Sequence, residues 1–416
     1  MSTTSSEPQL PADLLDTRLL KEQGLRGYVS GFTSRLRSGD LGSLPVVVGL
    51  VVIWLVFYLQ NDVFLSSRNL VNLALQSAAI GTISIGVVMV LLVAEIDLSI
   101  GSVSGVAAAA LAVGFVNKNW PLIVAVAIAI LVGTAIGLLY GFLYTRFGVP
   151  SFVITLAGLL GFLGLQLKIL GDTGSINIPF DTWLVKFAQQ AFLPAALSYA
   201  LAVAVPALYA ASRLLGNRRR SAAGLSTQPV LEIGVRAGLL LVALLIGTWY
   251  LNQDRGVSAM FLLFLALVVF MDLLLRKTRW GRSVYAIGGN VEAARRAGIA
   301  VNRVYVSVFV LCSTFAALGG VLAAARGAVA GQSSGGGDTN LNAIAAAVIG
   351  GTSLFGGRGS AYSALLGVLV ITSISSGLTL MNLDSSVRYM ITGAVLLLAV
   401  IIDSLSRRSR RSHGRA

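Results

Sequence analysis

The sequence predicts an all-α polytopic membrane protein, because its composition, its apolar stretches and the placement of its basic residues all agree. Of the 416 residues, 56% are hydrophobic and only 12% are charged. Soluble domains carry about 25% charged residues, so a water-soluble fold is excluded. We expect about 12 transmembrane helices, within a range of roughly 10 to 14, with the N-terminus and the C-terminus both in the cytoplasm (N-in and C-in).

Apolar stretches recur along the chain after a polar beginning. Most are close to the length of about 20 residues that crosses a bilayer as a helix. Hydrocarbon cannot satisfy backbone N–H and C=O groups, so each stretch is expected to be helical. The stretch 341–355 is short and residues 94–97 form a polar interruption, so each could belong to a broken or re-entrant helix. The predicted spans are 44–60, 70–93, 98–117, 121–144, 151–170, 192–212, 233–251, 257–275, 303–325, 341–355, 360–380 and 387–404.

The basic residues predict the orientation. The chain has 31 Lys and Arg against 17 Asp and Glu, a net charge of +14. With the N-terminus in the cytoplasm, most of the basic residues fall in cytoplasmic loops, as the positive-inside rule requires. This predicts a cytoplasmic N-terminal segment (1–43), a transmembrane domain (44–404) with a cytoplasmic loop (276–302), and a basic cytoplasmic tail (405–416). The basic residues are spread over separate loops, so we expect membrane lipid and no nucleic acid as a partner.

The chain offers few residues for catalysis or metal binding. Its only histidine, His413, lies in the basic tail, and its only cysteine, Cys312, lies inside an apolar stretch. A histidine-based metal site, a serine–histidine triad and an intrachain disulfide are therefore excluded. Residues 351–358 superficially resemble a phosphate-binding loop, but the Lys-Ser/Thr pair is missing and no strand is expected before them. We predict no catalytic residue and no metal site, and we interpret residues 350–360 as a tight glycine turn at the inner membrane face.

Glycines recur at close-packing spacing in two of the apolar stretches. Small residues at such positions let helix backbones approach each other where lipid offers no hydrophobic driving force. Packing of the helix bundle is the favoured interpretation, ahead of gating. The glycines are Gly133, Gly137 and Gly141, four apart, and Gly158, Gly161 and Gly164, three apart.

Two carboxyl groups interrupt the apolar pattern at residues 94–97. Ionisable side chains at membrane depth are costly and usually face protein or water. Glu95 and Asp97 are two residues apart, so on a regular helix or strand they cannot form a paired acid–base dyad. One interpretation is a discontinuous helix whose polar break lines or braces a pathway. The other is a short inner loop with solvated carboxylates, in which Asp97 or Ser99 caps the next helix; the residues alone favour neither.

The cytoplasmic segment 280–299 predicts a short amphipathic helix between two spans. Asn290 is suited to cap this helix, Glu292 is favourable in its first turn, and Gly298 can end it. On physical grounds alone, a solvated loop helix is the simpler interpretation.

The alternative is that this helix is a docking surface for another protein. Ala293 and Ala294 would leave a surface shallow enough to enter a partner's groove. Tyr285 and the nearby arginines would supply anchors of the kind found at interfaces.

Residues 95–102, 292–298 and 343–359 carry three motifs. Together these motifs resemble the permease subunits of bacterial ABC importers for monosaccharides, in the ribose/xylose branch. Residues 292–298 match the E-A-A-x-x-x-G core of binding-protein-dependent permeases. Residues 95–102 resemble the branch's "(G/E)IDLSVGS" signature. Residues 343–359 resemble its "AIAAxxIGGTSLxGG" stretch.

The resemblance covers roughly residues 45–405 and is strongest toward the longer, D-xylose type of permease. Two features resemble that type: the additional apolar residues near 192–275, and Glu95 where Gly is commoner. The N-terminal 43 residues and the Arg-rich tail lie outside it.

The resemblance implies a permease subunit in the bacterial inner membrane, with no active site of its own and no cofactor. It implies three partners: ATP-binding-cassette ATPase subunits, an extracytoplasmic sugar-binding protein, and a second permease copy that forms a homodimer. Glu95, Asp97 and Ser99 are expected to line or brace the translocation pathway. The residues expected to couple the permease to the ATPase are Gly281, Arg282, Tyr285, Asn290, Glu292, Ala293, Ala294 and Gly298.

Under this interpretation the chain translocates a monosaccharide that the binding protein delivers. The resemblance to the D-xylose type of permease implies that this monosaccharide is D-xylose. The alternative is an ion-coupled secondary sugar transporter, which would need membrane-embedded carboxylates that titrate, and only Glu95 and Asp97 are close together. A membrane-embedded enzyme such as a transferase is disfavoured, because no metal-ligand cluster or lipid-phosphate motif is present.

Overall fold

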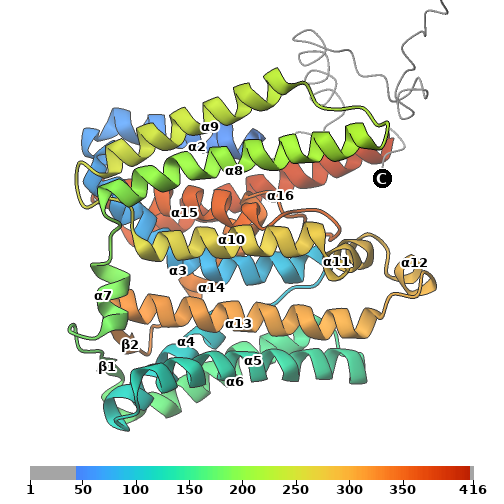
Figure 1. Ribbon diagram of the computed structural model, residues 1–416. Coiled ribbons are helices and arrows are strands. Elements are labelled where there is room, and N and C mark those ends of the chain that lie inside the picture. Colours follow the sequence, from blue (N-terminus) through green and yellow to red (C-terminus); the bar gives the residue numbers. More distant parts are fainter. Residues whose placement is uncertain (1–43, 413–416) are drawn as a thin grey trace, which may run out of the picture. The chain divides into compact units, whose positions relative to one another are not determined.

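The computed structural model describes residues 44–412, and these fall into two units that are described separately. Within the described residues, the larger unit takes in the chain up to Phe192 and from Ser258 to Arg408. The smaller unit contains Leu193–Val257. Both units are almost entirely helical (Figure 1).

The larger unit holds the break and the cytoplasmic segment singled out in the sequence. Its helices and strands, in chain order, are α2 (Leu44–Gln60), η3 (Asp62–Leu65), α3 (Ser67–Leu92), α4 (Ile100–Ala112), η4 (Val113–Asn117), α5 (Leu122–Phe147), α6 (Ser151–Leu170), η5 (Gly171–Thr173), β1 (Ser175–Asn177), α7 (Trp183–Gln189), α10 (Ala259–Lys277), α11 (Arg279–Gly289), α12 (Val291–Arg296), α13 (Val301–Gly327), β2 (Val329–Gly331), α14 (Gly337–Ile349), α15 (Tyr362–Leu380) and α16 (Ser385–Ser412).

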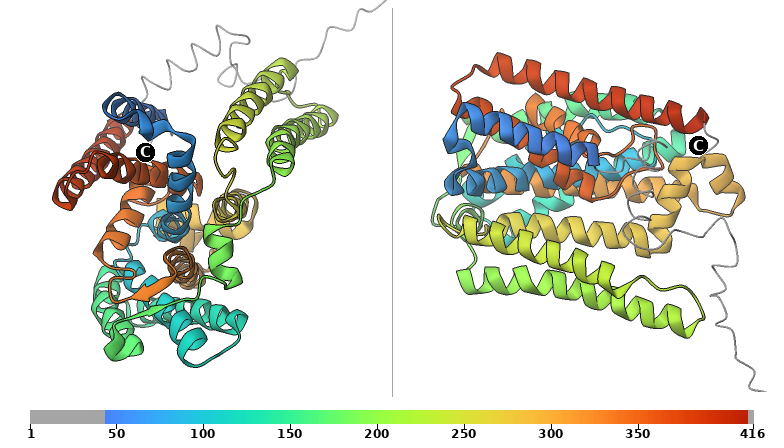
Figure 2. Two further views of the ribbon diagram at one scale, coloured as in Figure 1. Left: turned by 90° about the vertical axis from the view of Figure 1, so that its left-hand side faces the viewer. Right: turned by 90° about the horizontal axis from the view of Figure 1, so that it is seen from above.

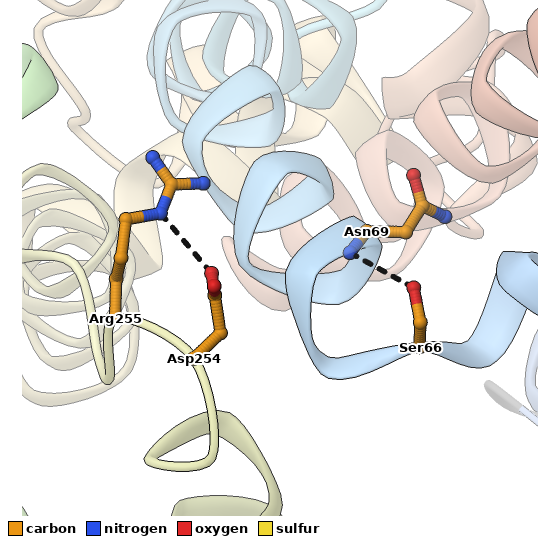
Figure 3. A network of polar contacts seen from close by, with 4 residues as sticks. All are labelled: Ser66, Asn69, Asp254 and Arg255. Carbon is orange, nitrogen blue, oxygen red and sulfur yellow. Dashed lines mark hydrogen bonds and ion pairs between the residues drawn. The ribbon is translucent and has the colours of Figure 1, made fainter.

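Local sequence sets the ends of these helices. Ser66 begins α3, where its hydroxyl accepts a hydrogen bond of 3.3 Å from the Asn69 backbone N–H (Figure 3). Pro121 and Pro150 precede α5 and α6, where a missing N–H costs nothing. Gly148 ends α5 in the left-handed conformation, at a φ of 66°, which glycine adopts without strain.

Close packing of α13 against α5, α3 and α4 forms the centre of the larger unit. A Cβ atom added to Gly137 or Gly141 of α5 would lie 2.6 or 2.7 Å from α13 backbone atoms, and one added to Gly133 would also collide with α13. The predicted packing role of these glycines is confirmed. On α6, only Gly158 has a close neighbour, the Tyr140 hydroxyl; Gly161 and Gly164 of that helix have nothing within 4 Å.

Each predicted apolar stretch contains a helix, although in the stretch 341–355 the helix ends at Ile349; the predicted number of about 12 spans is not confirmed. Within residues 44–412, 9 helices are long and apolar enough to cross a membrane. The apolar part of α16 is also short (Ser385–Leu398). The helix α2 has 17 residues and α14 has only 13. At 1.5 Å per residue, α14 is roughly 20 Å long, too short for a bilayer core of about 30 Å.

A pair of three-residue strands joins two distant loops of the larger unit. Strands β1 and β2 are antiparallel, with Ile176 opposite Ala330. This pairing was not predictable from the sequence, because each strand is too short to show an alternating pattern.

The smaller unit is a helical hairpin made of α8 (Ala195–Ala222) and α9 (Val230–Leu251). These two helices lie side by side in Figures 1 and 2. After α9, the Arg255 guanidinium pairs with the Asp254 carboxylate at 3.1 Å (Figure 3). The hairpin corresponds to the additional apolar material of the sequence, and both helices qualify as candidate spans.

Candidate functional site

The chain between α3 and α4 leaves helical geometry over residues 93–99, here called the α3–α4 break. Ala94 takes a φ of 63°, a left-handed conformation that side chains rarely adopt. The predicted discontinuity at residues 94–97 is therefore present. Its two carboxylates enter different surroundings, so the expectation that they form no dyad agrees with the geometry.

Asp97 is buried in a polar network that fixes the start of α4. Its side chain is 3% exposed. Oδ1 accepts hydrogen bonds from the Ser99 backbone N–H at 2.8 Å and from the Ser99 hydroxyl at 2.7 Å. The Tyr140 hydroxyl of α5 donates to the Ser99 Oγ at 2.7 Å, and the Cys312 thiol of α13 lies 3.6 Å from Oδ2. Asp97 thus ties the break to both α5 and α13.

This network decides between the two interpretations of the break for Asp97. A loop with solvated carboxylates is wrong for Asp97, which is shielded from water. Ser99 occupies the residue before α4 but makes no side-chain capping bond. The Asp97 carboxylate instead satisfies the Ser99 N–H, which is one of the donors that a helix start leaves without a partner.

Glu95 is half-buried and faces a pocket of about 510 Å³. The Tyr144 hydroxyl of α5 donates to its Oε1 at 2.5 Å. The Tyr144 ring packs against Tyr305 of α13, with 4.8 Å between ring centroids. Val291 and Arg295 of α12 line the same pocket, so the break and the predicted cytoplasmic helix meet there.

The predicted cytoplasmic helix, which begins after Asn290, is α12, and a second short helix, α11, precedes it. We call the two together the α11–α12 segment (residues 279–298). Figure 1 shows both helices at one end of the larger unit. Asn290 separates them, and its Oδ1 accepts a hydrogen bond of 2.9 Å from the Ala293 backbone N–H. Glu292 lies in the first turn of α12, and Gly298 follows it at a φ of 78°. The cap, first-turn and terminator roles expected from the sequence are all present.

The residues of the α11–α12 segment differ in exposure: some lie on its surface and others are buried. Glu292 and Ala293 are exposed, and Glu292 forms an ion pair of 2.8 Å with Arg295. Ala294 is 3% exposed, so the expectation that it joins Ala293 on a docking surface is wrong. The other exposed residues among those expected to couple to an ATPase are Arg282, Asn290 and Gly298.

Tyr285 and Gly281 hold α11 against the rest of the larger unit. The Tyr285 hydroxyl donates to the Gly359 carbonyl at 2.9 Å, so Tyr285 is an internal contact rather than the expected surface anchor. Burial raises the pKa of this hydroxyl above its ordinary value, which keeps it protonated as a donor. Gly281 is buried, and a Cβ there would collide with the backbone of Leu275 at the end of α10.

Sequence reasoning missed Tyr140, Tyr144 and Cys312 as partners of the break. Tyr140 and Tyr144 lie in one apolar stretch and Cys312 lies in another, where an aromatic residue or a cysteine is usually core. One signal was available: a tyrosine hydroxyl inside an apolar helix needs a hydrogen-bond partner when it is buried. The sequence does not show which partner that is, because the contacts join residues more than 40 positions apart.

The chain matches a known family over most of its length. Residues 69–400 match the model of the branched-chain amino acid transport system / permease component family. This chain is 35% identical to the xylose transport system permease protein XylH of Escherichia coli K12. The match covers 91% of this chain and 96% of the relative. The chain is 33% identical, over 90% of its length and 99% of the relative, to the Haemophilus influenzae protein of the same name.

A third relative is the ribose import permease protein RbsC of Escherichia coli K12. It is 29% identical over 86% of this chain and 92% of its own length. No solved structure matches this chain. These relatives are membrane transport permeases and not enzymes, and the apolar helices described above agree with a multi-pass protein of the bacterial inner membrane. The chain therefore belongs to the branched-chain amino acid transport system / permease component family.

Proposed function

We propose that this chain is the transmembrane permease subunit of an ABC importer and that it carries xylose. The proposal is supported by two relatives named as xylose permeases, which this chain covers almost from end to end. The single structural observation that carries it is the E-A-A-x-x-x-G motif on a capped, exposed helix outside the candidate spans.

ATP-binding-cassette ATPase subunits dock on the α11–α12 segment in this proposal. Support comes from Glu292 and Ala293, which lie on its surface, and from the Tyr285 and Gly281 contacts that attach it firmly to the larger unit. A surface that receives force must be both accessible and well anchored. The sugar reaches the opposite ends of the spans from a separate binding protein, and a second copy of the chain completes the path.

Glu95, Asp97 and Ser99 brace the pathway rather than contact the sugar. Asp97 and Ser99 are engaged with each other and buried, which leaves them little freedom to bind a passing solute. Glu95 is the accessible member, and it lies in the pocket beside α12. The α3–α4 break therefore connects the α11–α12 segment, where the ATPase docks, with α4.

The orientation in this proposal is N-in and C-in, with the α11–α12 segment in the cytoplasm. The segment 1–43 and part of the 405–416 tail lie outside the described residues. The 276–302 loop of the transmembrane domain (44–404) holds the α11–α12 segment, and its excess of Arg and Lys supports a cytoplasmic position.

Substitution of Glu292 tests the docking role. Glu292→Gln removes the negative charge from the exposed end of α12, and we expect ATP-driven xylose uptake to fall about tenfold, a common size for coupling between two sites. An exposed ion pair contributes only about 0 to 1 kcal/mol to stability, so the variant should still fold and insert. Uptake by membrane vesicles, with the amount of inserted chain measured by immunoblot, gives the result.

Glu232→Gln is the matched control, because Glu232 forms an i,i+4 ion pair with Arg236 on α9, in the smaller unit and outside the motif. Control uptake should equal that of the unsubstituted chain. Equal uptake by both variants would contradict docking through Glu292. Gly298→Ala, which forces a side chain into a φ of 78°, should reduce uptake in the same way as Glu292→Gln.

A further inference from the structure

Three segments meet through their backbones beside the α3–α4 break, with no side chains between them. They are Gly288 near the end of α11, Leu92 at the end of α3, and the glycine loop (residues 350–360) that joins α14 to α15. A Cβ atom added to Gly288 would collide with the Leu92 carbonyl oxygen and with the Gly357 nitrogen. We call this contact the glycine joint.

Hydrogen bonding and backbone conformation both hold the glycine joint together. The Gly357 N–H donates to the Leu92 carbonyl at 2.9 Å. Gly356 and Gly357 take φ values of 78° and 71°, which a side chain would strain. A Cβ added to Gly356 would lie 2.7 Å from the Ala94 Cβ and 2.8 Å from the Gly288 carbonyl oxygen. The loop is therefore inserted between α11 and the first residues of the break.

Two side chains of α11 reinforce this arrangement. The Tyr285 hydroxyl donates to the Gly359 carbonyl in the glycine loop. Trp280 Nε1 donates to the Ser307 hydroxyl of α13 at 2.8 Å. As a result, α11 cannot shift without moving the end of α3, the glycine loop or α13, because close-packed interiors transmit displacement rather than absorb it.

We propose that Gly288 is a positioning residue that passes movement of the α11–α12 segment to the α3–α4 break and to the glycine loop. Direct backbone contact makes the transfer stiff, since no flexible side chain lies between the moving parts. One end of the linkage is the segment that docks the ATPase, and the other is the start of α4 and of α15. The inference rests on the proposed function and adds the route by which it operates.

The chain supplies a matched pair of variants for the test. Gly288→Ala places a methyl group in the joint, whereas Gly289→Ala, one residue later, places it where no atom lies within 4 Å. Each variant is reconstituted in liposomes with its ATPase subunits and binding protein, and xylose transported per ATP hydrolysed is measured. We expect this ratio to fall about tenfold for Gly288→Ala, in the range usual for site-to-site coupling, and to stay unchanged for Gly289→Ala. Both variants should retain the ATPase on co-purification.

A second variant tests the joint without adding volume. Tyr285→Phe deletes only the hydroxyl that reaches Gly359, and we expect a smaller fall in the same ratio. Equal ratios for Gly288→Ala, Gly289→Ala and the unsubstituted complex would overturn the inference while leaving the proposed function intact. Loss of the ATPase from purified Gly288→Ala would also overturn it, because the residue would then serve assembly. If the unsubstituted chain transports xylose with no ATPase present, the proposed function itself fails.

Discussion

Asp97 is a buried carboxylate that stabilises the fold through its hydrogen bonds. Its Oδ1 satisfies both donors of Ser99, and burial makes an unsatisfied donor costly. Asp97→Ala should therefore lower the free energy of unfolding by about 1 to 3 kcal/mol, the usual cost of a buried polar group left without its partner. Thermal unfolding in detergent would show a lower midpoint.

Asp172 supplies the control for this prediction, because it is exposed in the turn after α6. Asp172→Ala should leave the midpoint unchanged. Asp97→Asn retains an acceptor oxygen and should lie between the other two variants. A midpoint for Asp97→Ala equal to that of Asp172→Ala would contradict a stabilising network at the break.

At the scale of single residues, the sequence identified which side chains were unusual but not what they touch. Glu95 and Asp97 were identifiable because charge is rare inside an apolar stretch. Glu95 accepts a hydrogen bond from Tyr144 of α5, whereas Asp97 is linked to Tyr140 of α5 only through Ser99. Local pattern carries no information on such distant pairings, so exposure and partners required the fold.

The helix α12 depends on its N-cap more than a longer helix would. It has six residues, and the Asn290 side chain satisfies one of the few donors at its start. Asn290→Ala should cost about 1 kcal/mol, while Asn290→Ser should cost little because serine also caps. Backbone amides of α12 should then exchange hydrogen faster in Asn290→Ala, as measured by mass spectrometry. Unchanged exchange in that variant would show that tertiary contacts, not the cap, hold α12.

Among the elements, those with strong local signals were predicted best. Asn290, Glu292 and Gly298 define the start, first turn and end of α12, and all three predictions agree with the structure. The helix α11, which ends where Asn290 begins α12, was not predicted. The burial of Ala294 was not predictable, since it depends on how α12 packs against its neighbours.

For the whole molecule, composition and hydropathy were enough to establish an all-helical membrane protein. Every predicted apolar stretch contains a helix, but the length of that helix decides whether it can span, and α2 and α14 are too short. In the apolar stretch 341–355 the helix ends in a glycine turn, although apolar residues follow that turn. The boundary between a span and a half-length helix is therefore set by turn geometry, here at Gly350 and Gly351.

Under the proposed function, this chain has no energy source of its own and is driven by a partner at the α11–α12 segment. The most direct test places the purified chain in liposomes, alone or with its ATPase subunits and xylose-binding protein, and measures uptake of labelled xylose. We expect uptake only when ATP and both partners are present, with no response to an ion gradient. Uptake by the chain alone, driven by an ion gradient, would contradict the proposed function.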